Sequence, residues 1–440
     1  MVDISSNQRA GTGQLRAGAD WTGEILASEQ ERKAHVVRRL GIGGNPDVVA
    51  RVTDIPSFIE AQLANRGHVT VPASLTTLPK SMKSNGTQYL PAWQWWLSQM
   101  ATNPRLLEER LTWFWHDHFA TGGAGMPGIV LLMRQQQTIR TNAMGNFGTL
   151  LRAIARDPAM MSFLDEEWNT YRRVNENYAR ELLELHTIGV GHYTQADVVA
   201  AATANTGWRV NHSTQSVRGV GPYAAFFDAN THARGTQMLL GKAVTDMDDV
   251  LTVLLADPNT ARRIAAKLYR RLVGLNPGTD RTTALAAVFR NSGYDIMTLV
   301  RAIVTSAEFV SDEAIRTQVR TPVEKLVTVM QALKQPDVTR LGGVGSWSTW
   351  LKDMDYRPFF PPNPAGYPKK RQMLVSTASL MNTLHLVKLT SSGMSGTATQ
   401  VLNRLGLFDV DPSTAAAVDS QPAGQGRMAM AVGSPEFQLA

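Results

Sequence analysis

The sequence predicts a mainly α-helical protein, a single large multi-helical domain that carries irregular or short β insertions. Apolar residues recur at the three- and four-residue spacing of helices along most of the chain from residue 91 onward. Strands and helices do not alternate as they do in parallel α/β proteins, and no repeat of fixed period is present. Hydrophobic residues make up 43 % of the chain and charged residues 18 %, which is enough apolar material for a real core.

Capping and helix-breaking residues set the bounds of the expected helices. Gly41 follows the first helix, Asn103 begins one that ends near Phe119, and Gly189 follows an acidic helix. Thr194, with Asp three positions later in place of the usual Glu, predicts a capping box. The helices expected on this basis cover residues 28–40, a stretch that opens at 91, 103–119, 128–145, 146–156, 174–188, 194–205, 246–256, 258–273, 281–291, 295–306, 321–334 and 371–389.

Three segments depart from the helical pattern. Residues 1–25 are polar and rich in Gly and Ala, so we expect a flexible N-terminal segment followed by one helical domain over residues 26–440. An insertion at about 206–240 favours short strands or a long irregular loop. A second insertion, at about 335–370, carries five prolines within eleven residues, 358–368, which excludes a helix there.

Composition excludes several classes of protein. The chain has no cysteine, so disulfides, thiolate metal sites and cysteine nucleophiles are excluded, and any metal would be held by His, Asp or Glu. The 44 basic and 37 acidic side chains give a net charge of +7, and the basic residues are scattered, so specific nucleic-acid binding is not expected. No apolar run approaches the roughly 20 residues of a membrane span, and no signal peptide is visible.

The first motif that could carry chemistry is FWHDHF at residues 114–119, which contains His116, Asp117 and His118. His118 shares a helix face with Leu107, Leu111 and Phe114, so it is expected to point into the apolar interior. Regular helix geometry does not let both histidines bind one ion, because they lie about 200° apart around the axis. Two interpretations stand: a metal ligand or general acid–base group, and a core histidine bonded to a backbone carbonyl.

The second motif is NENYARELLELH at residues 175–186. Asn177, Glu181 and Glu184 form a polar stripe at helical spacing, so the two carboxylates can converge. Paired carboxylates suit acid–base hydrolysis or a hard metal ion, and their repulsion in a dry cleft would raise one pKa. The alternative is a solvated face on which Arg180 forms i,i+4 ion pairs with both Glu176 and Glu184.

Other motifs give weaker signals. The string TIGVGHYT at residues 187–194 follows the acidic helix and resembles a string of phage-type lysozymes only locally. Five tryptophans gather at residues 93–96 and 113–115, and they would either stack on sugar rings or fill the core. The proline-rich stretch 359–368 could line a pocket or pack structurally. The chain holds no nucleophile elbow, P-loop, HExxH or dinucleotide fingerprint, and no motif indicates a cofactor.

Several of these strings together make the chain resemble the bacterial DUF1800 family, a domain of unknown function. The strings are HVVRRLG at 35–41, FWHDHF at 114–119, GNF at 145–147, DPAM at 157–160, LD at 164–165, NENYARELLEL at 175–185, TGW at 206–208, KL at 267–268, PPNPAGY at 361–367 and SPEF at 434–437. The resemblance covers about residues 35–437. The chain departs from it at Asp117, where the family usually has Asn, at His186, where Phe is frequent, and at Tyr367, where Trp is frequent.

The resemblance implies an exported or cell-envelope protein of unassigned activity, and it favours a buried polar site over a solvated face. The hypothesis that follows is a hydrolase acting on a polysaccharide or another envelope polymer, with glycosidase-like acid–base chemistry and, in one variant, metal assistance. The alternative is a non-catalytic exported module that binds a partner protein or glycan through the two insertions. The expected catalytic residues are Glu181, Glu184, His118 and Asp117, and the expected substrate-binding residues are Asn177, Arg180, Trp115, Trp208 and Tyr367.

Overall fold

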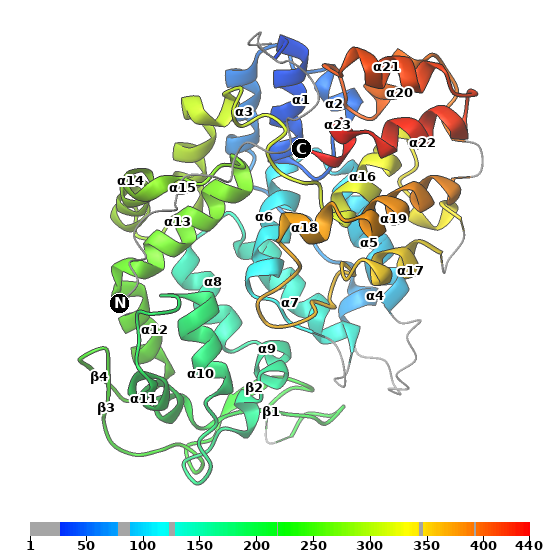
Figure 1. Ribbon diagram of the computed structural model, residues 1–440. Helices are drawn as coiled ribbons and strands as arrows, with labels where there is room; N and C mark the ends of the chain where they lie inside the picture. The colour runs from blue at the N-terminus through cyan, green and yellow to red at the C-terminus, as the bar shows by residue number, and fades with distance from the viewer. Residues whose placement is uncertain (1–26, 78–88, 123–127, 218, 343–345, 391–392) are drawn as a thin grey trace, which may run out of the picture.

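A computed structural model describes residues 27–77, 89–122, 128–217, 219–342, 346–390 and 393–440 of the chain. The expected flexible segment at residues 1–25 lies outside these ranges. The described residues form a mainly α-helical fold with two small two-stranded sheets, which confirms the predicted fold class (Figure 1).

The α-helices in chain order are α1 (Glu29–Leu40), α2 (Pro46–Val49), α3 (Ile55–Ala64), α4 (Ala73–Thr76), α5 (Tyr89–Thr102), α6 (Leu106–His118), α7 (Ile129–Asn142), α8 (Phe147–Ala155), α9 (Pro158–Phe163), α10 (Asn177–Glu181), α11 (Gln195–Asn205), α12 (Met247–Ala256), α13 (Pro258–Leu272), α14 (Gly278–Asn291), α15 (Ile296–Val304), α16 (Pro322–Ala332), α17 (Ser346–Asp353), α18 (Arg371–Leu374), α19 (Thr377–Lys388), α20 (Ala398–Arg404), α21 (Pro412–Asp419), α22 (Gln425–Gly433) and α23 (Pro435–Gln438). Short 3₁₀ turns are η2 (Glu166–Trp168), η4 (Ala307–Val310) and η5 (Val338–Arg340), and η3 (Leu182–His186) is a π-helical turn. The strands are β1 (Trp208–Val210), β2 (Ala225–Phe227), β3 (Gln237–Leu239) and β4 (Lys242–Val244).

Side-chain caps explain where several helices begin. The Ser28 hydroxyl accepts the backbone N–H of Glu31 at the start of α1. The predicted capping box of Thr194 with Asp197 is present at α11, and α16 begins with a second box. In the 206–240 insertion, β1 pairs with β2 and β3 pairs with β4, which lies just beyond it; both pairs are antiparallel, as the expectation of short strands anticipated.

Three helical predictions need correction. The expected helix over 174–188 begins only at Asn177, because the Asn175 side chain accepts the N–H of Asn177 and turns the chain, and it continues as the π-helical turn η3. The expected helix over 371–389 is split, because Ser376 caps α19 by accepting the N–H of Ser379. The second insertion, read as irregular, contains α17 before its prolines begin.

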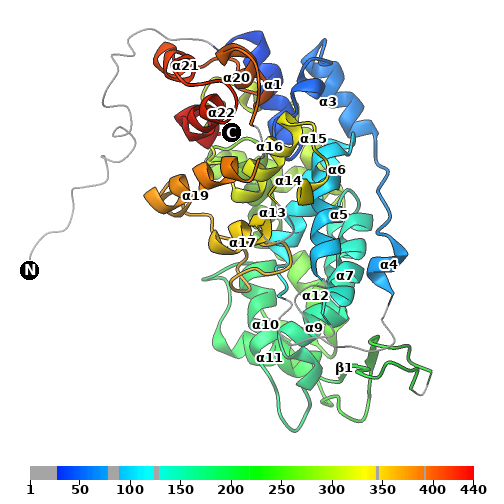
Figure 2. The ribbon, with the colours of Figure 1, turned by 90° about the vertical axis from the view of Figure 1, so that its right-hand side faces the viewer.

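Helix α6 lies inside the fold rather than on its surface. It packs against α1, α3, α5 and α7, which surround it in both views of the ribbon (Figures 1 and 2). Its Trp115 belongs to one hydrophobic cluster and its Trp113 to the other, so α6 joins the two cores. At its first turn the guanidinium of Arg140 contacts Glu108 and Glu109 at 2.6 Å each, which fixes α6 to α7. The motif at the end of α6 is therefore held from all sides.

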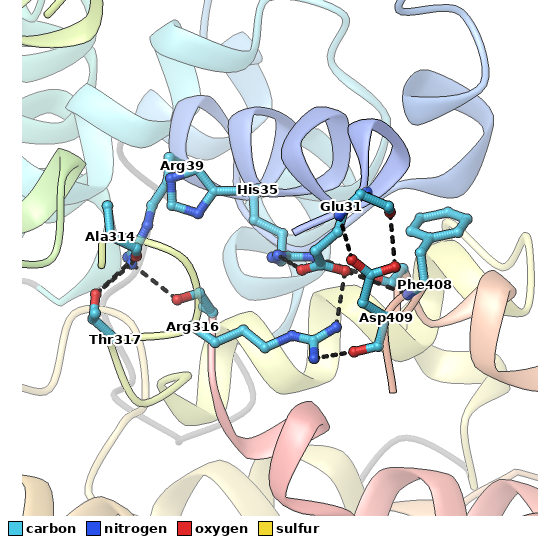
Figure 3. A network of polar contacts seen from close by, with 12 residues as sticks. Glu31, His35, Arg39, Ala314, Arg316, Thr317, Phe408 and Asp409 are labelled. Carbon is cyan, nitrogen blue, oxygen red and sulfur yellow. Dashed lines mark hydrogen bonds and ion pairs between the residues drawn. The ribbon is translucent and has the colours of Figure 1, made fainter. Parts of the chain in front are cut away.

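A buried ionic network fastens α1 to segments late in the chain (Figure 3). Glu31 contacts Arg38 at 2.5 Å and Arg316 at 2.8 Å, and Arg316 also donates to the carbonyl oxygen of Asp409. Beside it, Arg39 donates to the hydroxyl of Thr317 at 3.2 Å. The segment that precedes α16 is thus anchored to α1, and this segment forms one wall of the site described next.

Candidate functional site

His118 ends α6 with its ring buried, as the helix periodicity predicted. Its Nε2 lies 3.2 Å from the carbonyl oxygen of His186, and its Nδ1 lies 2.6 Å from Nζ of Lys267. A carbonyl oxygen only accepts, so Nε2 carries the ring proton and Nδ1 accepts a proton from Lys267. Burial, and then the charge of Lys267, lower the pKa of His118 well below its usual value, so the ring is neutral.

Lys267 lies on α13, on the face that meets the end of α6. Its side chain is partly buried, and Lys369, Arg263 and Arg270 are close enough to oppose its charge while Asp117 favours it. Burial, followed by Lys369 and Arg263, lowers the pKa of Lys267 to about 7. This lysine is therefore poised between its charged and neutral forms near neutral pH.

Asp117 connects α6 to the proline-rich segment in the opposite direction. Its Oδ1 accepts the backbone N–H of Tyr367 at 2.9 Å, and its Oδ2 lies 3.2 Å from Nζ of Lys369. Gly366 has a φ of +92°, and a Cβ there would lie 2.2 Å from Asp117 Oδ1. Only glycine allows this approach, so the contacts of Asp117 with Gly366 and Tyr367 hold the proline-rich segment against α6. The charge of Asp117 also favours the protonated form of Lys267.

Tyr367 anchors the same segment through its ring. The ring stacks on Trp113 at 5.2 Å between centroids, and the hydroxyl lies 2.9 Å from the carbonyl oxygen of Arg357 and 3.1 Å from His116 Nε2. The backbone N–H of Phe359 also donates to His116 Nε2, at 3.3 Å. Tyr367 was expected to bind substrate, and the structure places it in a wall of the site, with its hydroxyl already occupied.

Two cavities, of about 390 and 600 Å³, lie between α13, the end of α6 and the proline-rich segment. We call them together the cationic cleft. Lys267, Arg270 and Lys369 line both cavities. The first is further lined by Arg271, Arg371, Asp117, Thr317, Gln318, Thr321, Tyr356, Tyr367 and the faces of Trp113 and Phe114, and the second by Arg262, Arg263, His118, His192 and Asn259. Of the described residues that line the cleft, seven are basic and one, Asp117, is a carboxylate.

The predicted carboxylate pair lies beside this cleft and does not line it. Glu181 and Glu184 are close enough for the charge of one to affect the other: burial and then Glu184 raise the pKa of Glu181. Glu184 accepts the Tyr193 hydroxyl at 2.7 Å. Arg180 pairs with Glu176 at 2.8 Å, one of the ion pairs that the solvated-face alternative predicted.

Three predicted substrate-binding residues are engaged elsewhere. The amide of Asn177 donates to the carbonyl oxygen of Leu164 at 3.2 Å, which closes the turn before α10. Trp115 has no exposed surface and its indole N–H donates to the carbonyl oxygen of Ala143 at 3.0 Å, so it packs the core. Trp208, on β1, lies under the guanidinium of Arg156 at 4.9 Å. Of the site residues predicted from the sequence, His118, Asp117 and Tyr367 line the cleft, and the others lie in the structure around it.

Sequence reasoning missed the basic residues that define the cleft. They appeared as scattered pairs at 262–263, 270–271 and 369–371. A signal was present in α13, because Arg263, Lys267 and Arg270 recur at four- and three-residue spacing and so share one face. What the spacing could not show is that Lys369, a hundred residues later, faces them across a cavity.

Two further features concern metal ligands and membrane-spanning helices. Among the described residues, no three His, Asp or Glu side chains gather in a way that could hold a metal ion. None of the helices in the described ranges combines the length and the apolar character that crossing a membrane requires.

Taken together, the chain is a helical protein whose central helix meets a basic helix and a proline-rich segment at a cationic cleft. A family model described as "Protein of unknown function (DUF1800)" matches residues 35–439. The chain therefore belongs to the DUF1800 family, as the motif resemblance anticipated. Neither the search of curated proteins nor the search of solved structures finds a match.

Proposed function

We propose that this protein binds an anionic ligand in the cationic cleft, and that the ligand is a segment of a polymer that carries carboxylate, phosphate or sulfate groups. The observation that carries the proposal is the concentration of seven basic side chains around two adjoining cavities with Asp117 as the one described carboxylate. The net charge of the whole chain is only +7, so an even distribution of charge would not place seven basic side chains around two adjoining cavities.

The electrostatics of the cleft support this proposal. Cations that repel one another around a partly enclosed cavity raise the free energy of the unliganded protein, and an anion relieves this repulsion. The repulsion adds to the effect of burial at Lys267, whose pKa is lowered first by burial and then by Lys369 and Arg263. Arg271, in the wall of the first cavity, has its Nη2 3.5 Å from Oε1 of Glu324, which lies behind that wall. Guanidinium groups bind carboxylate and phosphate oxygens in pairs.

The second candidate is the hydrolase expected from the sequence, acting on a polysaccharide through Glu181 and Glu184. One observation favours it: the two carboxylates have unlike surroundings. Burial and the charge of Glu184 raise the pKa of Glu181, which suits a general acid, while Glu184 accepts a hydrogen bond from the Tyr193 hydroxyl. The non-catalytic alternative, a module that binds a glycan or a partner protein through the two insertions, needs no catalytic carboxylate.

One experiment separates these candidates. Dissociation constants for polygalacturonate, polyphosphate and dextran sulfate, with neutral dextran as reference, are measured by titration calorimetry, and released reducing ends or phosphate report turnover. The variant Arg270→Glu/Lys369→Glu should weaken polyanion binding about 100-fold, because it replaces two attractive charges by repulsive ones. The control Lys242→Glu/Lys388→Glu makes the same change in net charge at exposed positions outside the cleft.

The outcomes are distinct. Equal loss of binding in both double variants would contradict the cleft and leave only general charge attraction. Turnover that Glu181→Gln and Glu184→Gln each abolish, with binding retained, supports the hydrolase. Binding without turnover in the unmodified protein supports the non-catalytic module.

A further inference from the structure

We propose that Lys267 is a nucleophilic amine that forms a Schiff base with an anionic carbonyl compound, an aldehyde or ketone that also carries a phosphate or carboxylate group. The inference deepens the proposed function, because its anion-recognition half rests on the cationic cleft. Its second half, the covalent step, rests on the placement of Lys267 and His118.

Lys267 is placed where a ligand in either cavity can reach it. It lines both cavities, whereas the flanking Arg262 and Arg271 line one each. Its Nζ donates to His118 Nδ1 at 2.6 Å, and this contact aims the lone pair of the amine away from the ring. The carbonyl of His186 holds the opposite ring nitrogen of His118 in its protonated form, so Nδ1 is kept as a proton acceptor next to the amine.

The charges around Lys267 favour the neutral amine that an attack requires. Three cations face it: Arg263 and Arg270 from its own helix, and Lys369 from the proline-rich segment. Asp117 is the opposing charge, and it is shared with Lys369 and with the N–H of Tyr367. The rings of His118 and His186 add no charge, because burial lowers both of their pKa values, that of His186 to about 3. With burial, these groups bring the pKa of Lys267 to about 7.

Lys325 shows what a structural lysine looks like in the same fold. Burial also lowers its pKa, to about 8. Its Nζ, however, donates to Thr383 Oγ1 at 3.1 Å and to Gln438 Oε1 at 2.6 Å, and it lines neither cavity of the cleft. Lys325 is satisfied by oxygens, whereas the one contact that the structure gives Lys267 Nζ is a nitrogen that accepts a proton.

The chemical step balances without a further reactant. The lone pair of neutral Nζ attacks the carbonyl carbon, a C–N bond forms, and the electron pair of the broken C=O π bond moves to the oxygen. One Nζ proton passes by way of His118 Nδ1 to that oxygen, which gives a hydroxyl group. The second Nζ proton follows the same route, the hydroxyl group leaves as water, the C=N bond forms, and the net reaction is amine plus carbonyl giving imine plus water.

Pyridoxal 5′-phosphate, an aldehyde with a phosphate, is a suitable probe, and pyridoxal is the matched aldehyde without the charge. The full chain is incubated with each at pH 7, reduced with borohydride, and the modified lysines are located and quantified by peptide mass spectrometry. Lys267 should be modified at least about tenfold more than any other lysine, since Lys325 lines neither cavity of the cleft and an ordinary lysine is almost wholly protonated at this pH. Labelling of Lys267 should reach half its maximum near pH 7.

Variants check the assignment. Lys267→Arg, which keeps the charge and the fold, and Lys267→Met, which removes the charge, should both abolish the selective modification. The matched control Lys325→Arg should keep it. Circular dichroism of each variant shows that loss of labelling is not loss of fold.

The outcomes distinguish the two halves of the proposal. Selective labelling of Lys267 by the phosphate-bearing aldehyde, at least about tenfold over pyridoxal, supports both halves. Equal labelling by the two aldehydes supports the reactive lysine and contradicts anion recognition by the cleft. If polyphosphate binds the cleft and Lys267 is not trapped, or if labelling spreads evenly over the lysines, the Schiff-base proposal is overturned while the binding proposal stands or fails by its own test.

Discussion

The acidic segment, residues 175–186, and the cationic cleft meet at two backbone carbonyls, yet their charges are arranged in opposite ways. The carbonyl oxygen of His186 contacts His118, and that of Leu185 accepts from Arg263 at 3.3 Å. In the acidic segment most charged groups have partners: Arg180 bonds Glu176 and Gln195, and Tyr193 bonds Glu184. In the cleft seven basic side chains face a single described carboxylate.

This difference indicates that a ligand would bind at the cleft rather than at the acidic segment. The acidic segment carries the more conspicuous sequence motif. Most of its charged groups are already bonded to neighbouring residues, as in a structural element. The cleft has an excess of one charge that its described neighbours do not balance, and unbalanced charge around a cavity is what a binding partner would correct. Three predictions test this contrast.

The largest expected effect is on the free energy of unfolding, and it distinguishes a carboxylate behind the cleft wall from one in the acidic segment. Glu324 contacts Arg110 at 2.6 Å and Arg271 at 3.5 Å. Glu324→Gln leaves these buried guanidiniums uncompensated and should lower the free energy of unfolding by about 3–5 kcal/mol. Glu184→Gln replaces the charged acceptor of the Tyr193 hydroxyl by a neutral amide oxygen and should cost about 1 kcal/mol or less. Urea unfolding followed by circular dichroism measures both.

The pH dependence of this effect has a definite sign. Burial alone would raise the pKa of Glu324, but Arg271 and Arg110 outweigh it and hold the pKa well below its usual value. The stabilisation by Glu324 is therefore fully present above about pH 4.3, the pKa of an unfolded glutamate, and is lost as the pH falls below it. Equal costs for Glu324→Gln and Glu184→Gln at pH 7 would contradict the contrast.

The next effect compares two glycines with positive φ. Gly366 touches Asp117 at the cleft, and Gly191, in the turn after the acidic segment, has open space around it. Alanine at Gly191 should cost about 1–2 kcal/mol, the strain of a left-handed conformation alone. Alanine at Gly366 adds a clash with Asp117 and should cost about 1–3 kcal/mol more. It should also weaken polyanion binding, because it displaces Lys369; unchanged binding in a folded Gly366→Ala protein would show that the segment is not a wall of the site.

The smallest expected effect is a pH dependence of anion affinity. As the pH falls from 8 to 6, Lys267 takes up a proton and adds one positive charge to the cleft. Polyphosphate affinity should rise about fivefold over this range in low salt, a modest gain because the cleft is partly open to solvent. Lys267→Met should flatten the profile and Glu181→Gln should leave it in place. A profile that persists in Lys267→Met would assign the titration to another group.

The sequence predicts the fold and the interior orientation of His118 because both depend on local periodicity and capping. The capping box at Thr194 and the exclusion of a helix from the proline-rich stretch are local signals of the same kind, and both are confirmed. The break before Asn177 escaped prediction because the Asn175 side chain accepts the backbone N–H of Asn177, and this bond competes with helix extension.

The cleft escaped prediction for a different reason. Its basic residues come from α13 and from a segment a hundred residues later, and only the tertiary fold brings Lys267 and Lys369 to one cavity. Periodicity along either segment reveals a charged face and nothing of what that face meets. The carboxylate pair, by contrast, was placed close together correctly from helical spacing, and its catalytic role stays a prediction.

The last turn of α6 has a consequence for the size of ligand that the cleft can admit. Consecutive residues there reach opposite walls: Asp117 holds the proline-rich segment and His118 holds α13. The distance between the two walls is therefore set by neighbouring residues of one buried helix. A cleft of fixed width selects ligands by their size. Substitutions along the rims would change the attraction for an anion, whereas a different width would require rebuilding the helix end itself.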